Sequence, residues 1–107
     1  MAERDNPLTE AVFYILLALR KPNHGYGIIQ NVEKLSSGRV RLAAGTLYGA
    51  INTLLEKGWI TALDGEADSR KKEYEITEAG REMLQKELQR LEELVQNGKY
   101  LLGGETV

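Results

Sequence analysis

The residues of this chain that could do chemistry are few, and they favour binding over catalysis. Its only histidine, His24, has no partner cluster around it, so we interpret it as a hydrogen-bonded turn residue and not as a catalyst or ligand. The absence of cysteine excludes disulfides and thiolate metal sites. A calcium loop is mimicked only weakly by Asp64, Glu66 and Asp68, because the final glutamate of that motif is missing. No paired catalytic carboxylates are recognisable, so we expect no enzyme activity, no metal and no cofactor.

The densest run of positive charge, Arg70-Lys71-Lys72, has the chemistry to contact phosphate groups. It ends a polar stretch between two short alternating segments, 60–63 and 73–77, which predict the strands of a β-hairpin. A charge run of this kind usually covers a solvated face. This hairpin, however, follows a predicted helix-turn-helix, where it would form a wing against the DNA backbone.

The segment 44–57 is the element that would have to read DNA, and its pattern predicts a helix. Apolar residues recur at helical spacing along one side: Leu47, Ile51, Leu54 and Leu55. The other side carries small, uncharged residues with larger polar ones at its flanks: Thr46, Gly49, Ala50 and Thr53, flanked by Tyr48 and Asn52. Such a smooth, hydrogen-bonding face can enter a major groove. An ordinary amphipathic helix with a bland exterior explains this stretch alone about equally well.

Two further helices are expected before it. The first covers residues 8–20 with Asn6 capping its start, and it is apolar around so much of its circumference that it needs cover on more than one side. The second covers residues 24–35 and ends near Gly38, a residue suited to a left-handed cap. With the helix at 44–57 it forms a helix-turn-helix candidate.

A last helix is expected over residues 78–97. Its apolar residues keep the 4-3-4 spacing of a coiled-coil seam, widened at two positions: Leu84, Leu88, Leu91 and Val95, with Met83 and Leu94. The helix could fold back on the first helix of its own chain. We favour a homodimer contact through both helices, with Val12 contributing from the first. The tail 98–107 is expected to fray.

Length and charge set the outer bounds. A chain of 107 residues predicts one domain with a small core, which dimerisation often supplements. The net charge of −2 argues against simple nucleic-acid binding, but it is unevenly spread. Residues 1–72 carry 10 Lys and Arg against 8 Asp and Glu, whereas residues 73–107 carry 4 against 8. The front of the chain is therefore mildly basic. The sequence shows no signal peptide and no apolar run long enough for a bilayer, so we expect a cytoplasmic protein without membrane contact.

Several short motifs occur together in the order of these elements: HGYG at 24–27, GTLY at 45–48, LLEKGWI at 54–60 and YEITEAG at 74–80. In this combination the chain resembles the PadR family of bacterial transcriptional regulators, in particular its small members with a single C-terminal helix. The resemblance implies a winged helix-turn-helix dimer that binds a palindromic operator, usually represses, and is released by a small effector.

The family pattern carries over residue by residue. It places Tyr26, Thr46, Tyr48 and the basic wing near DNA, and it puts Leu47, Leu54 and Leu55 in the core. The chain departs from the pattern at Ala43, where a capping Ser or Thr is common, at Gly49, where Pro is common, and at Glu73 in the approach to the second wing strand. The last helix has no aromatic residue before Tyr100, so the aromatic ligand site of some relatives is not carried over.

These observations predict a mainly α fold with a β-hairpin wing (α+β): a winged helix-turn-helix over 1–77 and a dimerisation helix with its tail over 78–107, forming one compact unit. The expected DNA contacts are Tyr26, Thr46, Tyr48, Asn52, Arg70, Lys71 and Lys72. The expected dimer contacts are Val12, Leu84, Leu88, Leu91 and Val95. The partners are double-stranded DNA, a second copy, and a small apolar or aromatic effector near Val12, Phe13 and the last helix. A winged helix that binds protein and not DNA is the alternative, and the net acidity favours it.

Overall fold

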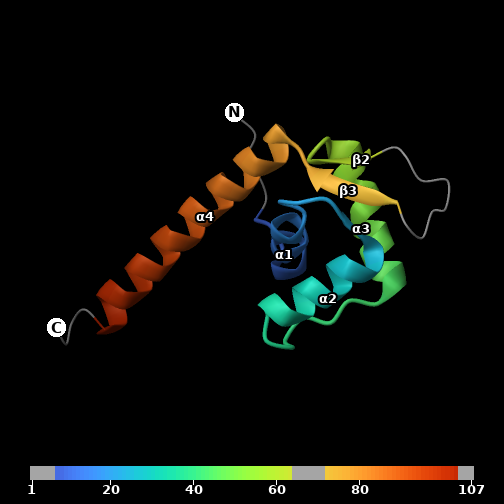
Figure 1. The fold of residues 1–107 in the computed structure, drawn as a ribbon. Helices are drawn as coiled ribbons and strands as arrows, with labels where there is room; N and C mark the ends of the chain where they lie inside the picture. The colour runs from blue at the N-terminus through green and yellow to red at the C-terminus, as the bar shows by residue number, and fades with distance from the viewer. Residues whose placement is uncertain (1–6, 64–71, 104–107) are drawn as a thin grey trace.

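The computed structural model describes residues 7–63 and 72–103, and it confirms the mainly α fold with a β-hairpin (Figure 1). The elements follow in the order α1 (Glu10–Ala18), β1 (Asn23–His24), α2 (Gly25–Leu35), α3 (Ala44–Lys57), β2 (Ile60–Leu63), β3 (Glu73–Ile76) and α4 (Glu78–Gly98). A π-helical turn, η2 (Lys99–Gly103), continues α4. The tail was expected to fray from residue 98, and that prediction is wrong as far as residue 103.

One apolar core joins α1, α2, α3 and the sheet. Aliphatic side chains dominate it because each helix turns one stripe inward. The fully buried members are Ile15, Leu16, Leu19, Ile28, Val32, Leu47 and Ile51. Their even spacing along three helices fixes how α3 lies on α1 and α2, and therefore which side of α3 faces outward.

The sheet has three antiparallel strands in the order β1-β3-β2. The hairpin strands pair from Ile60 opposite Ile76 to Leu63 opposite Glu73, as the alternating pattern predicted. The short strand β1 was not predicted, because two residues carry no periodic signal. It pairs His24 with Glu73, so the base of the wing is joined to the start of α2.

Helix ends follow their capping chemistry. Helix α1 begins later than expected, because Thr9 is its cap and accepts the N–H of Val12. His24 is hydrogen-bonded, as expected, but it lies in β1 and not in a turn: its Nδ1 accepts the N–H of Gly27 at 3.2 Å and caps α2. Ala43 makes no side-chain cap for α3, also as expected. Gly58 ends α3 with φ +76°, a left-handed conformation that favours glycine.

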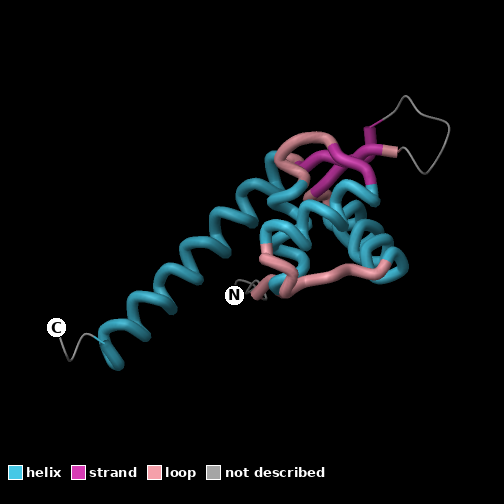
Figure 2. Tube along the Cα trace, turned by 60° about the horizontal axis from the view of Figure 1, so that its bottom comes forward, coloured by secondary structure: helices cyan, strands magenta, loops and turns pink. Residues whose placement is uncertain are grey.

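Helix α4 begins beside α1 and then projects away from the other helices as a rod (Figures 1 and 2). Leu84 in its first half is buried in the core of its own chain. Beyond Leu91 every residue of the helix is exposed. The seam expected for the dimer is thus divided into a covered part and an open part.

A buried carboxylate connects α4 to the chain just before α1. Glu87 lies on the inner side of α4 and accepts the backbone N–H of Leu8 at 3.2 Å. It also accepts two hydrogen bonds from the Arg90 guanidinium, at 3.0 and 2.6 Å. The hydrogen bond from Arg90, helped by the Leu8 N–H and opposed by burial, holds the pKa of the Glu87 carboxyl below its usual range.

Glu87→Gln is expected to lower the free energy of unfolding by about 1–3 kcal/mol at pH 7, because hydrogen bonds to a charged group are lost. A lowered pKa means that the ionised form stabilises the fold above the ordinary glutamate pKa, and that this stabilisation is lost as the pH falls through the folded pKa. Urea unfolding at pH 7 and near pH 4 should therefore show the difference shrinking in acid. Glu93→Gln, an exposed change on the same helix, should leave stability nearly unchanged. An equal loss in both variants would contradict this role for Glu87.

Candidate nucleic-acid interface

The outward side of α3 carries small side chains and almost no charge. Gly45, Thr46, Gly49 and Asn52 are all exposed. A Cβ added at Gly45 or Gly49 would meet nothing within 4 Å, so neither glycine is required by packing inside this chain. The first turn of α3 contains no acidic residue, which leaves the positive end of the helix dipole unopposed. This side can therefore approach a polyanion closely.

The outer face is narrower than the sequence suggested. Ala50 is half-buried and packs against the core, so it does not belong to the outward side. Thr53 is exposed, but its hydroxyl donates back to the carbonyl of Gly49 at 3.2 Å, and the residue lines a groove towards α1 and α4. The expectation that Ala50 belongs to the outer face is wrong, because Ala50 packs against the core, whereas Thr53 is exposed as expected.

Two tyrosines stand near the start of α2. Tyr26 is 67% exposed and Tyr48, reaching over from α3, is 39% exposed. The phenol of Tyr48 lies against Gly25. Tyr48 and Asn52 are one helical turn apart, so their side chains share one flank of α3. The structure thus places the Tyr48 ring against the start of α2, where Tyr26 is the next residue along the chain.

The base of the wing also lies next to the start of α2. Lys72 directly precedes Glu73, which pairs with His24 just before α2, and Lys72 is half-buried. The sheet therefore holds one of the three expected wing cations near the start of α2. The other two, Arg70 and Lys71, lie outside the described residues.

The arginines that lead into α3 are already paired. Arg39 forms an ion pair with Glu10 of α1, and Arg41 lies 3.5 Å from Glu33 of α2. All four side chains are well exposed, so these pairs contribute little to stability. They reduce the positive charge available beside α3, and the wing cations are then the main expected source of phosphate contacts.

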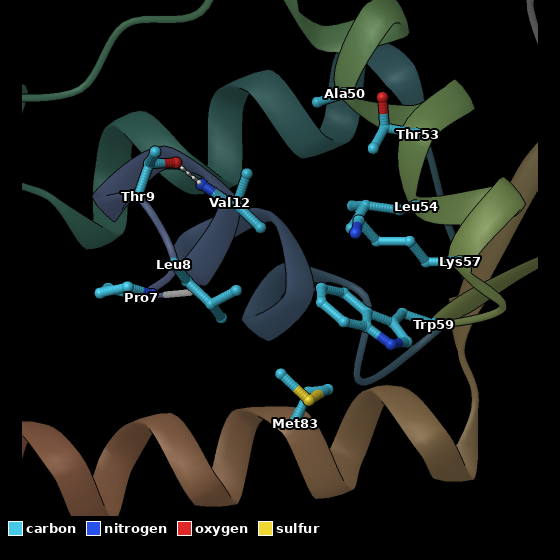
Figure 3. Close-up of a pocket in the computed structure, with 10 residues that line it drawn as sticks. All are labelled: Pro7, Leu8, Thr9, Val12, Ala50, Thr53, Leu54, Lys57, Trp59 and Met83. Atoms are coloured by element: carbon cyan, nitrogen blue, oxygen red, sulfur yellow. Dashed lines mark hydrogen bonds between the residues drawn. The ribbon is translucent and has the colours of Figure 1, made fainter. Parts of the chain in front are cut away.

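A groove of about 470 Å³ separates α1, α3 and α4 (Figure 3). Trp59 and Met83 stand on its walls, and the ammonium group of Lys57 points into it, 5.1 Å from the centre of the Trp59 ring. This is a cation–π geometry. No carboxylate of the described residues pairs with Lys57. The groove combines apolar walls with one cation, which suits an amphiphilic anion.

The expected effector space near Val12 and Phe13 is divided in two. Val12 lines the groove of Trp59 and Met83, whereas Phe13 lines a second groove, of about 360 Å³, with Tyr14 and Leu91. Helix α1 runs between them. Trp59 is half-buried: it packs against the core with one part and forms a groove wall with another.

Sequence reasoning missed Lys57, Trp59 and Glu87. A signal was present for Glu87: it falls inside the apolar stripe of α4, between Leu84 and Leu91, where an acid needs a partner. No comparable signal marks Lys57, because a lysine in the last turn of a helix is common for dipole reasons alone.

Residues 7–63 and 72–103 contain no group of three or more His, Asp or Glu side chains arranged to hold a metal ion. Over the same residues, the structure has no helix with the length and apolar character that a membrane span requires.

Three packed helices with a helix-turn-helix, followed by a β-hairpin, define a winged-helix protein. Residues 14–86 match the Transcriptional regulator PadR-like family, and the chain belongs to that family. The resemblance inferred from its motifs is thereby confirmed, and the chain falls among transcriptional regulators and not among enzymes.

Known relatives agree with this fold. A transcriptional regulator from Clostridium thermocellum superposes with a TM-score of 0.70 at 22% identity, covering 86% of this chain and 91% of that one. Bacillus subtilis PadR, solved in complex with operator DNA, superposes with a TM-score of 0.64 at 24% identity, covering 78% of this chain and 49% of that one. An uncharacterized 37.1 kDa protein in transposon TN4556 of Streptomyces fradiae is 38% identical over 79 residues, which are 73% of this chain and 22% of that protein. The chain therefore spans about a fifth of that relative.

Proposed function

We propose that this regulator is a homodimer that binds a palindromic operator and represses transcription. The exposed side of α3 carries the proposal, because it is small, free of charge along Gly45 to Asn52, and mounted in a winged-helix frame. Two copies of α3 would enter successive major grooves about one helical turn apart. Tyr26, Tyr48 and Lys72 would lie at the groove edge and the flanking backbone.

The dimer is supported by the open half of α4. Leu88 is 48% exposed, and Leu94 and Val95 are each 53% exposed, which is unusual for a run of large apolar side chains on one helix. The 4-3 spacing of Leu88, Leu91 and Val95 continues at Gly98 and Leu102. A second copy of α4 is the occupant that this seam suits best, and Val12 and Leu84 then stabilise its base from within the subunit.

Selection from genomic DNA tests the function. The full chain, incubated with sheared DNA of its source organism, should retain fragments that share an inverted repeat. Affinity for a retained fragment should fall steeply with salt, since phosphate contacts release counterions. If no fragment is enriched and random duplex binds without salt dependence, the protein-binding alternative is the better description.

We further propose that a small effector of apolar or aromatic character releases the protein from DNA by binding the groove of Trp59. The groove lies behind α3 and touches α1 and α4, so an occupant would alter how the reading helix sits relative to the dimer helix. Lys57 favours an occupant with a carboxylate or another anionic group.

The only tryptophan of the chain makes this effector site directly observable. Titration with planar aromatic acids should change Trp59 fluorescence and raise the melting temperature, because the ligand stabilises the folded state that it binds. It should also weaken operator binding, because the bound ligand would change the position of α3 relative to α4. Lys57→Ala should lower the affinity for an aromatic acid by about 10-fold or more and leave the affinity for the matching neutral amide unchanged. Lys34→Ala, an exposed change on α2, is the matched control. An unchanged fluorescence, melting temperature and DNA affinity across the panel would remove the support for this effector.

A further inference from the structure

Gly25 is a glycine that the backbone does not require. Among the described residues, positive φ angles occur in glycine only at Gly38 and Gly58, so Gly25 has a backbone conformation that any residue can adopt. It is the first residue of α2 and is buried. Since glycine lowers helix stability relative to alanine, its presence at this position needs another reason.

The reason is the space taken by Tyr48. A Cβ at position 25 would stand 2.8 Å from Cζ of the Tyr48 ring and closer still to its hydroxyl oxygen, nearer than real Cβ atoms come. The ring therefore lies in the place where a side chain of residue 25 would be. Only glycine allows α2 and the ring of Tyr48 to be this close.

Tyr48 also interacts electrostatically with a tyrosine of the sheet. Tyr74, buried in β3, lies close enough that Tyr48 adds to the rise of the Tyr74 pKa, whose main cause is burial. The Tyr48 ring lies against the start of α2, with part of its surface open to solvent. Its direction is therefore constrained by α2 and not by α3 alone.

We infer that Gly25 is a positioning residue for DNA recognition: the missing side chain lets the Tyr48 ring lie on α2 and so fixes where the exposed part of the ring would meet DNA. This inference rests on the proposed DNA-binding function. Gly25 itself needs no contact with DNA. It acts through Tyr48, and a substitution there should misplace the tyrosine without unfolding the chain.

Gly80 offers the matched contrast. A Cβ at Gly80 would collide with the backbone carbonyl of Trp59 and stand 2.7 Å from Cγ1 of buried Ile76. Neither group can move easily, because the Trp59 carbonyl also accepts the N–H of Thr77 at 2.9 Å. At Gly25 the obstructing atoms are the far end of one side chain, which can rotate away.

The test is a double-mutant cycle on Gly25→Ala and Tyr48→Leu, measured on operator DNA. We expect each single variant to lower affinity on the order of 10-fold, as loss of one DNA contact does. The double variant should lose little more than either single one, because both remove the same tyrosine contact. The melting temperature of Gly25→Ala should stay close to that of the wild type, whereas Gly80→Ala should melt earlier. The inference would be overturned if the double variant lost affinity by the product of the two single losses, or if Gly25→Ala kept wild-type affinity.

A measurement without DNA separates this inference from the proposed function. In the wild type, NMR should show short distances between the Gly25 Hα protons and the Tyr48 ring protons. In Gly25→Ala the Tyr48 ring should lose its contacts to residue 25 while the Ile15 and Leu47 core signals persist. A ring that keeps its place in this variant would refute the positioning role, even if DNA binding is confirmed. Failure of the wild type to bind DNA would refute the proposed function, whatever the ring position.

Discussion

Leu88→Asp is expected to convert the proposed dimer into a monomer and to lower operator affinity by at least about 100-fold. The variant places a charge in a contact that would be desolvated, which costs on the order of several kcal/mol in each subunit. A monomer can occupy only one half-site, so the gain from linking two reading helices is lost as well. Sedimentation velocity and operator titration, done at the same protein concentrations, check both effects.

The structure makes Leu88 the most informative position of the seam. Leu84 is buried in its own chain, so a charge there would damage the fold itself. Leu88 is 48% exposed, and a charge at this position leaves the core of the single chain intact. Circular dichroism should therefore show a folded variant.

Gln89→Asp is the matched control. Gln89 is the next residue and exposed, but it lies about 100° around α4 from Leu88 and so outside the seam, and it receives the same charge. It should remain dimeric and bind operator as the wild type does. A wild type that sediments as a monomer at high micromolar concentration would contradict the proposed dimer. It would also contradict the proposal that two α3 helices of one dimer bind the two half-sites of a palindromic operator.

The elements of this fold were predictable where the sequence is periodic. The spacing of Leu47, Ile51 and Leu54 determined α3 within the bounds found, because one face of the helix had to be buried. Gly58 and Thr77 marked the end of α3 and the start of α4 through their capping chemistry. Local signals of this kind act within one or two turns, so a sequence alone displays them.

The features that the sequence did not predict depend on contacts between segments that are distant along the chain. The half-buried position of Ala50 follows from packing three helices together, and no pattern in α3 specifies it. The pairing of His24 with Glu73 joins residues 49 positions apart and carries no local signature. For the same reason the space that Tyr48 takes at Gly25 could not be inferred from either residue. The candidate site was therefore predictable in its residue types, and much less so in their orientation.

Replacing Arg70, Lys71 and Lys72 together with alanine is expected to weaken binding to operator and to random duplex alike. Up to about six phosphate contacts are lost per dimer, so the slope of log affinity against log salt should become shallower by up to about five units. The structure contributes one part of this expectation: Lys72 directly precedes β3 and lies near the start of α2. Fluorescence anisotropy over a salt series, on both DNAs, gives the slope.

The double variant Thr46→Ala, Asn52→Ala should lose sequence preference and not overall affinity for DNA. Both side chains are exposed on α3, where a base edge and not a phosphate is the expected partner. The preference for operator over random DNA should narrow, on the order of 10-fold or more, while the salt slope stays nearly constant. Stability should change by less than about 0.5 kcal/mol, because neither side chain is buried.

The two sets of variants together decide between DNA and protein as the partner. A regulator that reads DNA must lose charge-dependent affinity through the wing and sequence preference through α3, since the two surfaces meet different parts of the duplex. If the wing variant binds operator with normal affinity and an unchanged salt slope, the three cations only solvate the surface. The acidic net charge would then favour a winged helix that docks on protein. If the α3 variant instead loses affinity for all DNA equally, α3 contacts the backbone and the bases are read elsewhere.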